Sequence, residues 1–284
     1  MTITSTPPLT LNFFTMFTAL NWSKWLGIPE NYSDHGGNVD HMIDIVHWFM
    51  FALFLGWTLF FLFCLWKFRA SNNPKASYQG VTNHVSSHLE IGMVIIEAVL
   101  LLGFAFPLWW ERTDQFDEVQ KTDPVRVRVI GYQFAFNYHY PGDDGKFGRI
   151  DRSLVKTGGD PCIDPDDPNG YDDFTSGILK LPVDRNVILQ ITSTDVIHNY
   201  SIIPMRIQQD AIPGRDIPMW FKPIKMLETN VVCGNLCGEG HANMKGVMEV
   251  ISQKAFNGRA VEQSKASLKK IQEAQKAAGG LAQK

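Results

Sequence analysis

Two long stretches of apolar residues constrain this chain more than any other feature of its sequence. The first, residues 48–66, carries no charge, and the second, residues 91–110, carries one, at Glu97. At a rise of about 1.5 Å per residue, either stretch forms a helix long enough to cross a hydrocarbon core of about 30 Å. A buried core helix is the alternative for each, but two such stretches in 284 residues predict a transmembrane hairpin.

Charges beside these stretches predict the orientation of the hairpin. The connecting loop carries three basic residues and no acidic residue before Glu90, and such a positive excess marks the cytoplasmic side. The N-terminal segment and everything after Trp110 then face outward. Carboxylates inside membrane helices are costly and often functional. Glu90 is therefore either a solvated helix-end residue or a functional one, and Glu97 is either neutral, paired with a neighbouring subunit or part of a proton path.

From residue 125 onward the pattern changes from a helical one to that of strands. Residues 125–138 alternate between apolar and other side chains, which is the period of a β-strand. Further strand-like runs occupy residues 178–183, 187–192, 197–203, 219–221, 230–233 and 246–251. Several short strands with close turns predict an all-β sandwich or barrel. Since no helical segments alternate with them, a parallel α/β sheet is disfavoured.

These patterns predict four parts: an outer N-terminal segment (1–45), a helical hairpin (46–110), a β domain (111–253) and a basic tail (254–284). Residues 141–176 form an insertion with nine acidic and four basic residues. We expect a solvated surface loop there, and a negative field that steers a basic protein partner is the functional hypothesis. The net charge of -3 argues against nucleic-acid binding. Four cysteines are too few for a disulfide scaffold.

Metal-binding side chains are concentrated between residues 233 and 244. Two thiols, an imidazole and a thioether fall within this segment, at Cys233, Cys237, His241 and Met244. The interspersed glycines disfavour a helix, so we predict a loop wrapped around a metal. Sulfur combined with imidazole selects copper or zinc, and the thioether favours copper. His198, in a strand-like segment upstream, is a candidate second imidazole.

Other interpretations account for part of this motif. A Cys233–Cys237 disulfide is possible in an oxidising compartment, but it leaves His241 and Met244 unexplained. A structural zinc site wants four Cys or His ligands, commonly with closer cysteines. A copper chaperone or a free copper-storage module needs neither two membrane helices nor this all-β domain. Covalent haem is excluded, because there is no Cys-x-x-Cys-His.

Over most of residues 40–253 the chain resembles subunit II of haem–copper cytochrome c oxidases. The resemblance rests on the Cys-x3-Cys-x3-His-x2-Met motif and on the segment Asp195-Val-Ile-His198. It also rests on Gln209-Asp-Ala-Ile-Pro-Gly-Arg215 and on Leu89-Glu90-Ile91. Subunit II of a quinol oxidase is the main rival, with the same architecture but without the copper ligands.

The resemblance implies a cupredoxin-like sandwich that carries CuA, a dinuclear mixed-valence copper centre. In this family two cysteines bridge both coppers, two histidines bind one copper each, and a methionine and a backbone carbonyl are the remaining ligands. These roles fall on Cys233, Cys237, His198, His241, Met244 and the carbonyl of Asn235. Electrons arrive from a c-type cytochrome and pass to haem in subunit I, where oxygen is reduced to water and protons are pumped. The implied partners are subunits I and III, the cytochrome and membrane lipid.

Three positions depart from the family pattern. Asn235 replaces a glutamate that reaches a magnesium or manganese ion at the subunit I interface, so we expect at most a weak magnesium site there. Phe134-Ala-Phe136 replaces the Trp-Tyr-Trp motif of electron entry, and Glu97 replaces a proline. Glu90 matches the entrance of the family's proton channel. The long tail and these departures favour a bacterial plasma membrane, with the copper domain in the periplasm, over the mitochondrial inner membrane.

Overall fold

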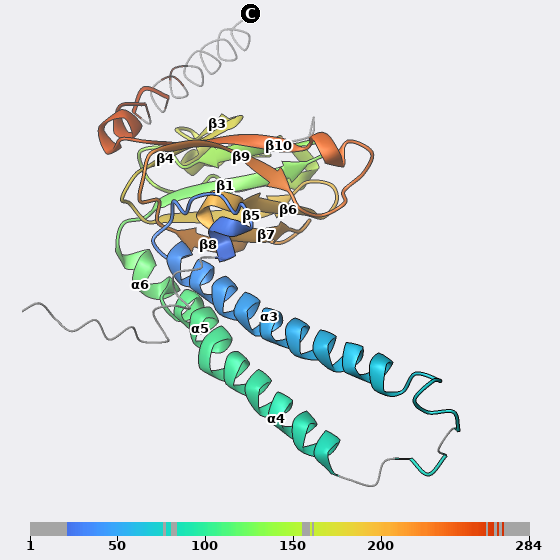
Figure 1. Ribbon diagram of the computed structural model, residues 1–284. Coiled ribbons are helices and arrows are strands. Elements are labelled where there is room, and N and C mark those ends of the chain that lie inside the picture. Colours follow the sequence, from blue (N-terminus) through green and yellow to red (C-terminus); the bar gives the residue numbers. More distant parts are fainter. Residues whose placement is uncertain are drawn as a thin grey trace, which may run out of the picture. The chain divides into compact units, whose positions relative to one another are not determined.

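The computed structural model describes residues 22–75, 78–80, 84–154, 160, 162–259, 261–263, 266 and 269. Within these residues the chain forms two compact units, a helical one and a β-rich one that also includes residues 30–37 (Figure 1). Most of the predicted outer N-terminal segment before Trp22, and most of the predicted basic tail after Arg259, lie outside the described residues.

The helical unit is a hairpin of two long helices. It contains α2 (Trp22–Trp25), α3 (Gly36–Lys67), α4 (Val85–Leu100), a π-helical turn η1 (Leu101–Ala105) and the start of α5 (Phe106–Asp114), which α6 (Phe116–Lys121) follows. Residues 36–67 and 85–121 are long and apolar enough to cross a membrane, as predicted, although both helices begin before the apolar stretches. The π-helical turn ends two residues before Pro107, a residue that a regular helix accommodates poorly.

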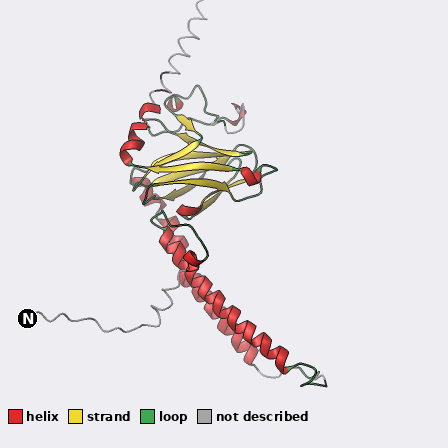
Figure 2. Ribbon diagram, turned by 45° about the horizontal axis from the view of Figure 1, so that its top comes forward, coloured by secondary structure: helices red, strands yellow, loops and turns green. Residues whose placement is uncertain are grey.

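The β-rich unit is a sandwich of two five-stranded sheets (Figure 2). One sheet has the order β3-β2-β1-β5-β8 and the other the order β4-β10-β9-β6-β7. The strands are β1 (Val125–Tyr132), β2 (Ala135–Tyr140), β3 (Phe174–Ser176), β4 (Ile178–Pro182), β5 (Val187–Ser193), β6 (His198–Ile202), β7 (Ile207–Ala211), β8 (Ile217–Phe221), β9 (Leu227–Cys233) and β10 (Lys245–Ile251). The predicted all-β sandwich is confirmed.

The core lies between the sheets, because alternate side chains of a strand point to the same face. Val127 and Val129 of β1 and Leu189 and Ile191 of β5 are completely buried there. β1 pairs in parallel with β5, with Val127 opposite Leu189, and β10 pairs in parallel with β4. The remaining strand pairs are antiparallel. The sheets are therefore mixed, but without the helical crossovers of an α/β fold.

Three features of the sandwich differ from the sequence predictions. Residues 125–138 belong to two antiparallel strands, β1 and β2, which a turn at Gln133 and Phe134 separates. β3 and β7 were not predicted; both lie at sheet edges, where polar residues are tolerated on a strand. The insertion 141–176 is not wholly solvated, because Cys162 and Asp173 are only 3% and 6% exposed.

A buried hydrogen-bond cluster fixes this insertion to the sheet. Asp173 accepts hydrogen bonds from His139 Nε2 (2.6 Å), the backbone N–H of Gly148 (2.8 Å) and that of Gly142 (3.2 Å). Arg128 donates to His139 Nδ1 at 3.3 Å, and its guanidinium lies 4.5 Å from the ring centre of Phe147. Burial lowers the pKa of His139, and the hydrogen bond to Asp173 only partly offsets this effect. Buried polar groups need partners. Asp173 finds them in His139 of β2 and in the backbone of the insertion, so this cluster holds the insertion on the sheet.

Candidate metal centre

The predicted metal ligands meet at one end of the sandwich. Cys233 is the last residue of β9, His198 is the first of β6, and Met244 immediately precedes β10. Cys237 and His241 lie in the loop between β9 and β10. Because β6 pairs antiparallel with β9, the start of β6 and the end of β9 lie at the same end of the sheet. The sandwich thus gathers two segments that are thirty-five residues apart in the sequence.

Donor atoms of all six predicted ligands lie close together. Cys237 Sγ is 3.8 Å from Cys233 Sγ, 3.6 Å from His241 Nδ1 and 3.6 Å from Met244 Sδ. The backbone carbonyl oxygen of Asn235 is 3.2 Å from Cys233 Sγ. Ligand atoms of His198, Cys233 and Cys237 all lie within 4.8 Å of one another. No disulfide joins the two cysteines, so both thiols are available to a metal.

The surroundings of the two ring nitrogens of His198 show whether this cluster suits a metal. The residue is completely buried, and its Nε2 lies 2.8 Å from Asp195 Oδ1. Its Nδ1 is buried and has no hydrogen-bond partner among the described residues. An unpartnered buried nitrogen is costly, whereas a metal-binding imidazole typically bonds a carboxylate through its other nitrogen. With two thiolates, two imidazoles and a thioether, the residues present fit copper.

Ionisation of the surrounding groups depends on burial and on local hydrogen bonds. Burial and the neighbouring Cys233 thiol raise the pKa of Cys237 to about 11. A metal must therefore displace a proton from this thiol, which couples metal affinity to pH. Partial burial opposes ionisation of Asp195, but hydrogen bonds from Gln133 N–H, His198 and Val196 N–H outweigh it and lower the pKa of that carboxyl. Asp195 thus stays anionic beside His198.

The β1–β2 turn covers the cysteine loop. The Gln133 side chain donates to the carbonyl oxygen of Cys237 (2.7 Å), and its backbone N–H donates to Asp195 Oδ2 (2.7 Å). Phe134 packs directly on Gly240, where an added Cβ would come within 2.4 Å of the phenyl ring. Sequence reasoning did not identify Gln133 as part of the site, because nothing but its position beside Phe134 pointed there. Through these contacts the turn joins the cysteine loop to Asp195 and keeps Phe134 packed on the loop.

The other predicted site residues occupy different environments. Phe134 is 37% exposed, whereas Phe136 is buried, with its ring perpendicular to that of Tyr200 and the ring centres 5.0 Å apart. Glu90 is an exposed residue of α4, in the helical unit, and does not belong to the cluster. Glu97 follows two turns later in the same helix, four residues before the π-helical turn.

Comparisons with known proteins agree with this architecture. Residues 125–251 match the family described as "Cytochrome C oxidase subunit II, periplasmic domain". "Alternative cytochrome c oxidase subunit 2" of Bradyrhizobium diazoefficiens is 27% identical over 236 residues, which cover 82% of this chain and 81% of the relative. "Cytochrome c oxidase subunit 2" of Cereibacter sphaeroides is 31% identical over 212 residues, which cover 70% of this chain and 67% of the relative. The chain belongs to the cytochrome c oxidase subunit II family.

Among solved structures, the periplasmic domain of subunit II of cytochrome oxidase from Bradyrhizobium japonicum is similar. It matches with 28% identity and a TM-score of 0.39, over 52% of this chain and 98% of that one.

Membership of the family confirms the predicted fold class, a two-helix hairpin followed by a cupredoxin-like sandwich. The chain is subunit II of a haem–copper oxidase and works with subunit I in an oxidoreductase complex. It is a membrane protein with an external domain, and its family implies a copper centre.

Proposed function

We propose that His198 and the loop from Cys233 to Met244 hold a dinuclear copper centre of the CuA type. The supporting observation is the convergence of five side-chain donors and the Asn235 carbonyl on one small volume, together with the unpartnered Nδ1 of His198. When bound, two coppers bridged by thiolates share one unpaired electron and supply one-electron transfer with little change in bond lengths.

Each ligand has a distinct proposed role. Cys233 and Cys237 would supply the two thiolates that both metals share, and His198 and His241 would each supply one imidazole. Met244 and the backbone carbonyl of Asn235 would complete the site as weaker ligands. Asp195 orients the His198 ring through its hydrogen bond to Nε2. Such outer partners fix the tautomer and raise the basicity of a ligating imidazole.

We further propose that the chain accepts electrons from a c-type cytochrome and passes them to haem in subunit I, which reduces oxygen to water and pumps protons. Phe134 suits an entry role because it is partly exposed and packs on the ligand loop. Phe136 contributes from the interior beside Tyr200. Glu90, near the start of α4, is the proposed entrance of a proton channel.

The surroundings follow from the same proposal. The β domain (111–253) faces the periplasm of a bacterium, because both Bradyrhizobium and Cereibacter supply relatives; the mitochondrial inner membrane is the alternative. The hairpin (46–110) contacts lipid and subunit I, and subunit III completes the complex. The tail (254–284) carries seven basic and two acidic residues.

Electron paramagnetic resonance of the purified, copper-loaded chain tests this function. We expect a hyperfine pattern with equal coupling to two copper nuclei, since both thiolates lie between the metals. A spectrum of one isolated copper would contradict the proposal. So would a diamagnetic Cu(I) site that no oxidant converts to a paramagnetic one.

The charge of the β domain gives a prediction about the electron donor. Residues 111–253 hold 21 acidic and 15 basic residues, and the insertion 141–176 contributes nine of the acidic ones. We expect oxidation of a soluble basic cytochrome c to slow as salt rises, because the Debye length is only about 8 Å at physiological ionic strength. Steady-state turnover over a salt series measures this effect. Salt-independent turnover would instead indicate a permanently bound donor.

Asn235 gives a prediction about magnesium. A divalent ion at the subunit interface needs hard, anionic oxygen ligands, and an amide oxygen is a weaker ligand than a carboxylate. We therefore expect less than stoichiometric magnesium in the purified oxidase, and more in an Asn235→Glu variant. The copper signal should be unchanged, since this residue contacts Cys233 through its backbone carbonyl, which the substitution keeps. Tightly held, stoichiometric magnesium in the unmodified enzyme would show the expectation to be wrong.

A further inference from the structure

A second site lies at the end of the sandwich away from the copper ligands. A cavity of about 270 Å³ opens there, and its lining includes Arg126, Tyr140, Phe174, Arg185 and Phe256. β1 begins at this cavity with Val125 and ends at Tyr132, beside the turn that covers the ligand loop. At about 3.3 Å per residue, the strand separates the two sites by roughly 23 Å. The cavity is therefore spatially separate from the ligand loop.

Arg126 gives the cavity an uncompensated positive charge. Its side chain is half-buried and makes no hydrogen bond or ion pair with any residue in the described part of the chain. Arg185, by contrast, is occupied: it donates to the carbonyl oxygen of Asp123 (2.9 Å) and to its carboxylate (2.7 Å). This pair is internally neutral, so Arg126 is the cation of the lining that has no partner among the described residues. An arginine presents a fork of donors that matches phosphate and carboxylate oxygens.

The positive charge of Arg126 stands in a domain whose net charge is negative. Residues 111–253 have an excess of six acidic residues, which disfavours nonspecific attraction of anions. An anion that binds in this cavity must therefore be held by local contacts and not by the overall field.

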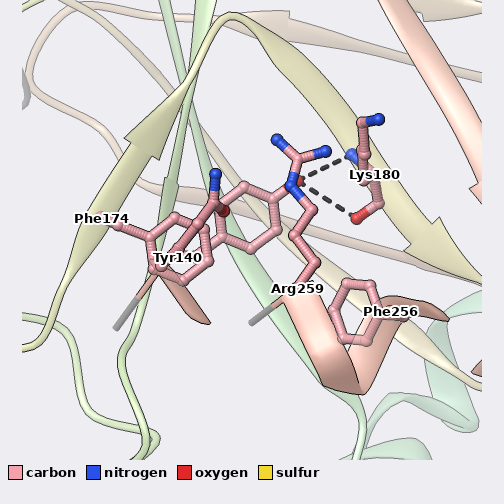
Figure 3. Close-up of a pocket in the computed structure, with 6 residues that line it drawn as sticks. Tyr140, Phe174, Lys180, Phe256 and Arg259 are labelled. Atoms are coloured by element: carbon pink, nitrogen blue, oxygen red, sulfur yellow. Dashed lines mark hydrogen bonds between the residues drawn. The ribbon is translucent and has the colours of Figure 1, made fainter. Parts of the chain in front are cut away.

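Aromatic rings also line the cavity. Tyr140 and Phe174 are stacked, with ring centres 4.8 Å apart and planes 9° from parallel. The Tyr140 hydroxyl accepts from the backbone N–H of Lys180 (2.8 Å) and donates to its carbonyl (3.2 Å), as Figure 3 shows. These bonds fix the tyrosine ring, so the wall is formed before any ligand arrives. A preformed aromatic surface beside polar groups is typical of small-molecule sites.

The first turn of the C-terminal segment forms part of the cavity lining. Ser252 caps this turn, with its hydroxyl accepting from the backbone N–H of Ala255 at 3.3 Å. Phe256 packs against the core and lines both the cavity and the small hollow beside it, where Arg259 lies close to Tyr140 (Figure 3). The tail thus adds an apolar side chain to the cavity and a second cation to its neighbourhood.

We propose that this cavity binds a small organic phosphate, with the phosphate on Arg126 and an apolar group against Tyr140, Phe174 and Phe256. Its volume lies just below the range of about 300–1,000 Å³ for ligand pockets, which suits a group the size of a single ring or a short chain. A soluble phosphate monoester and a phospholipid headgroup share this chemistry, and the choice between them is left to the test.

Calorimetric titration of the purified oxidase in detergent tests the proposal. The probes are phenyl phosphate, inorganic phosphate, phenol and dihexanoyl phosphatidic acid. We expect phenyl phosphate to bind more tightly than inorganic phosphate, and phenol to give no signal. Tighter binding of the phosphatidic acid than of phenyl phosphate assigns the site to a lipid headgroup, and the reverse order assigns it to a soluble ester.

Variants identify the groups responsible. Arg126→Gln should weaken phenyl phosphate binding roughly tenfold to hundredfold, as the loss of a charged hydrogen bond does, and Arg126→Lys should weaken it less. Phe256→Ala should weaken phenyl phosphate more than inorganic phosphate. Lys254→Gln is the matched control, because Lys254 is exposed on the same turn, outside the cavity lining, and its loss removes the same charge.

Two results would overturn the proposal. One is the absence of binding by every phosphate probe to the unmodified oxidase. The other is equal affinity in Arg126→Gln and Lys254→Gln, which would indicate general charge attraction. The copper signal of each variant, expected to be unchanged, shows that the β domain is folded.

Discussion

Cys237→Ser is expected to abolish the spectrum of two equally coupled coppers. Cys237 Sγ is the central donor of the cluster, within 3.8 Å of the donor atoms of Cys233, His241 and Met244. A hydroxyl is a poor ligand for copper and does not bridge as a thiolate does. Copper affinity should fall by more than the roughly 10- to 100-fold that follows removal of a hydrogen-bond partner of a metal ligand. Electron paramagnetic resonance and copper analysis of the purified chain measure it.

Two controls accompany this variant. Cys64→Ser removes a thiol from α3 of the helical unit and should leave the copper signal intact. Met244→Leu removes only a weak ligand and should shift the spectrum without abolishing it. If the coupling to two coppers persists in Cys237→Ser, the proposed bridging role is wrong.

Asp173→Ala is expected to destabilise the β domain by about 3 kcal/mol or more, because the removal of a buried partner leaves other groups unsatisfied. The carboxylate is completely buried and accepts hydrogen bonds from His139 and from two backbone N–H groups of the insertion. All three donors would lose their partner at once. Urea unfolding of the purified chain in detergent, followed by near-ultraviolet circular dichroism, measures the change.

Asp172→Ala is the matched control for that variant. Asp172 is the preceding residue, is only half-buried and, among the described residues, accepts a single hydrogen bond, at 3.3 Å, from the backbone N–H of Asp144. Its loss should cost well under half as much. Similar unfolding midpoints for the two variants would mean that the buried cluster does not anchor the insertion.

The sequence was sufficient to predict a structural feature wherever the residues that determine it lie in one short segment. Length and apolar composition determine a membrane helix, because a span must satisfy its own backbone hydrogen bonds in lipid; the stretches at 48–66 and 91–110 therefore predicted both helices. Cys233, Cys237, His241 and Met244 lie within one short segment, from the end of β9 to the residue before β10, so their spacing alone indicated a soft metal. Alternation along residues 125–138 likewise indicated strand structure, although this run forms two strands, β1 and β2.

Tertiary structure alone decided which distant residues meet. Gln133 reaches Cys237 and Asp195, and Asp173 reaches His139, only because strand pairing closes the intervening chain. Nor does composition distinguish the buried Asp173 from its half-buried neighbour Asp172. The cavity beside Arg126 likewise depends on strand ends and a helical turn that are far apart in the sequence. Local patterns determine segments, since they depend on neighbouring residues, whereas burial and partners depend on contacts that exist only after the sheets have packed.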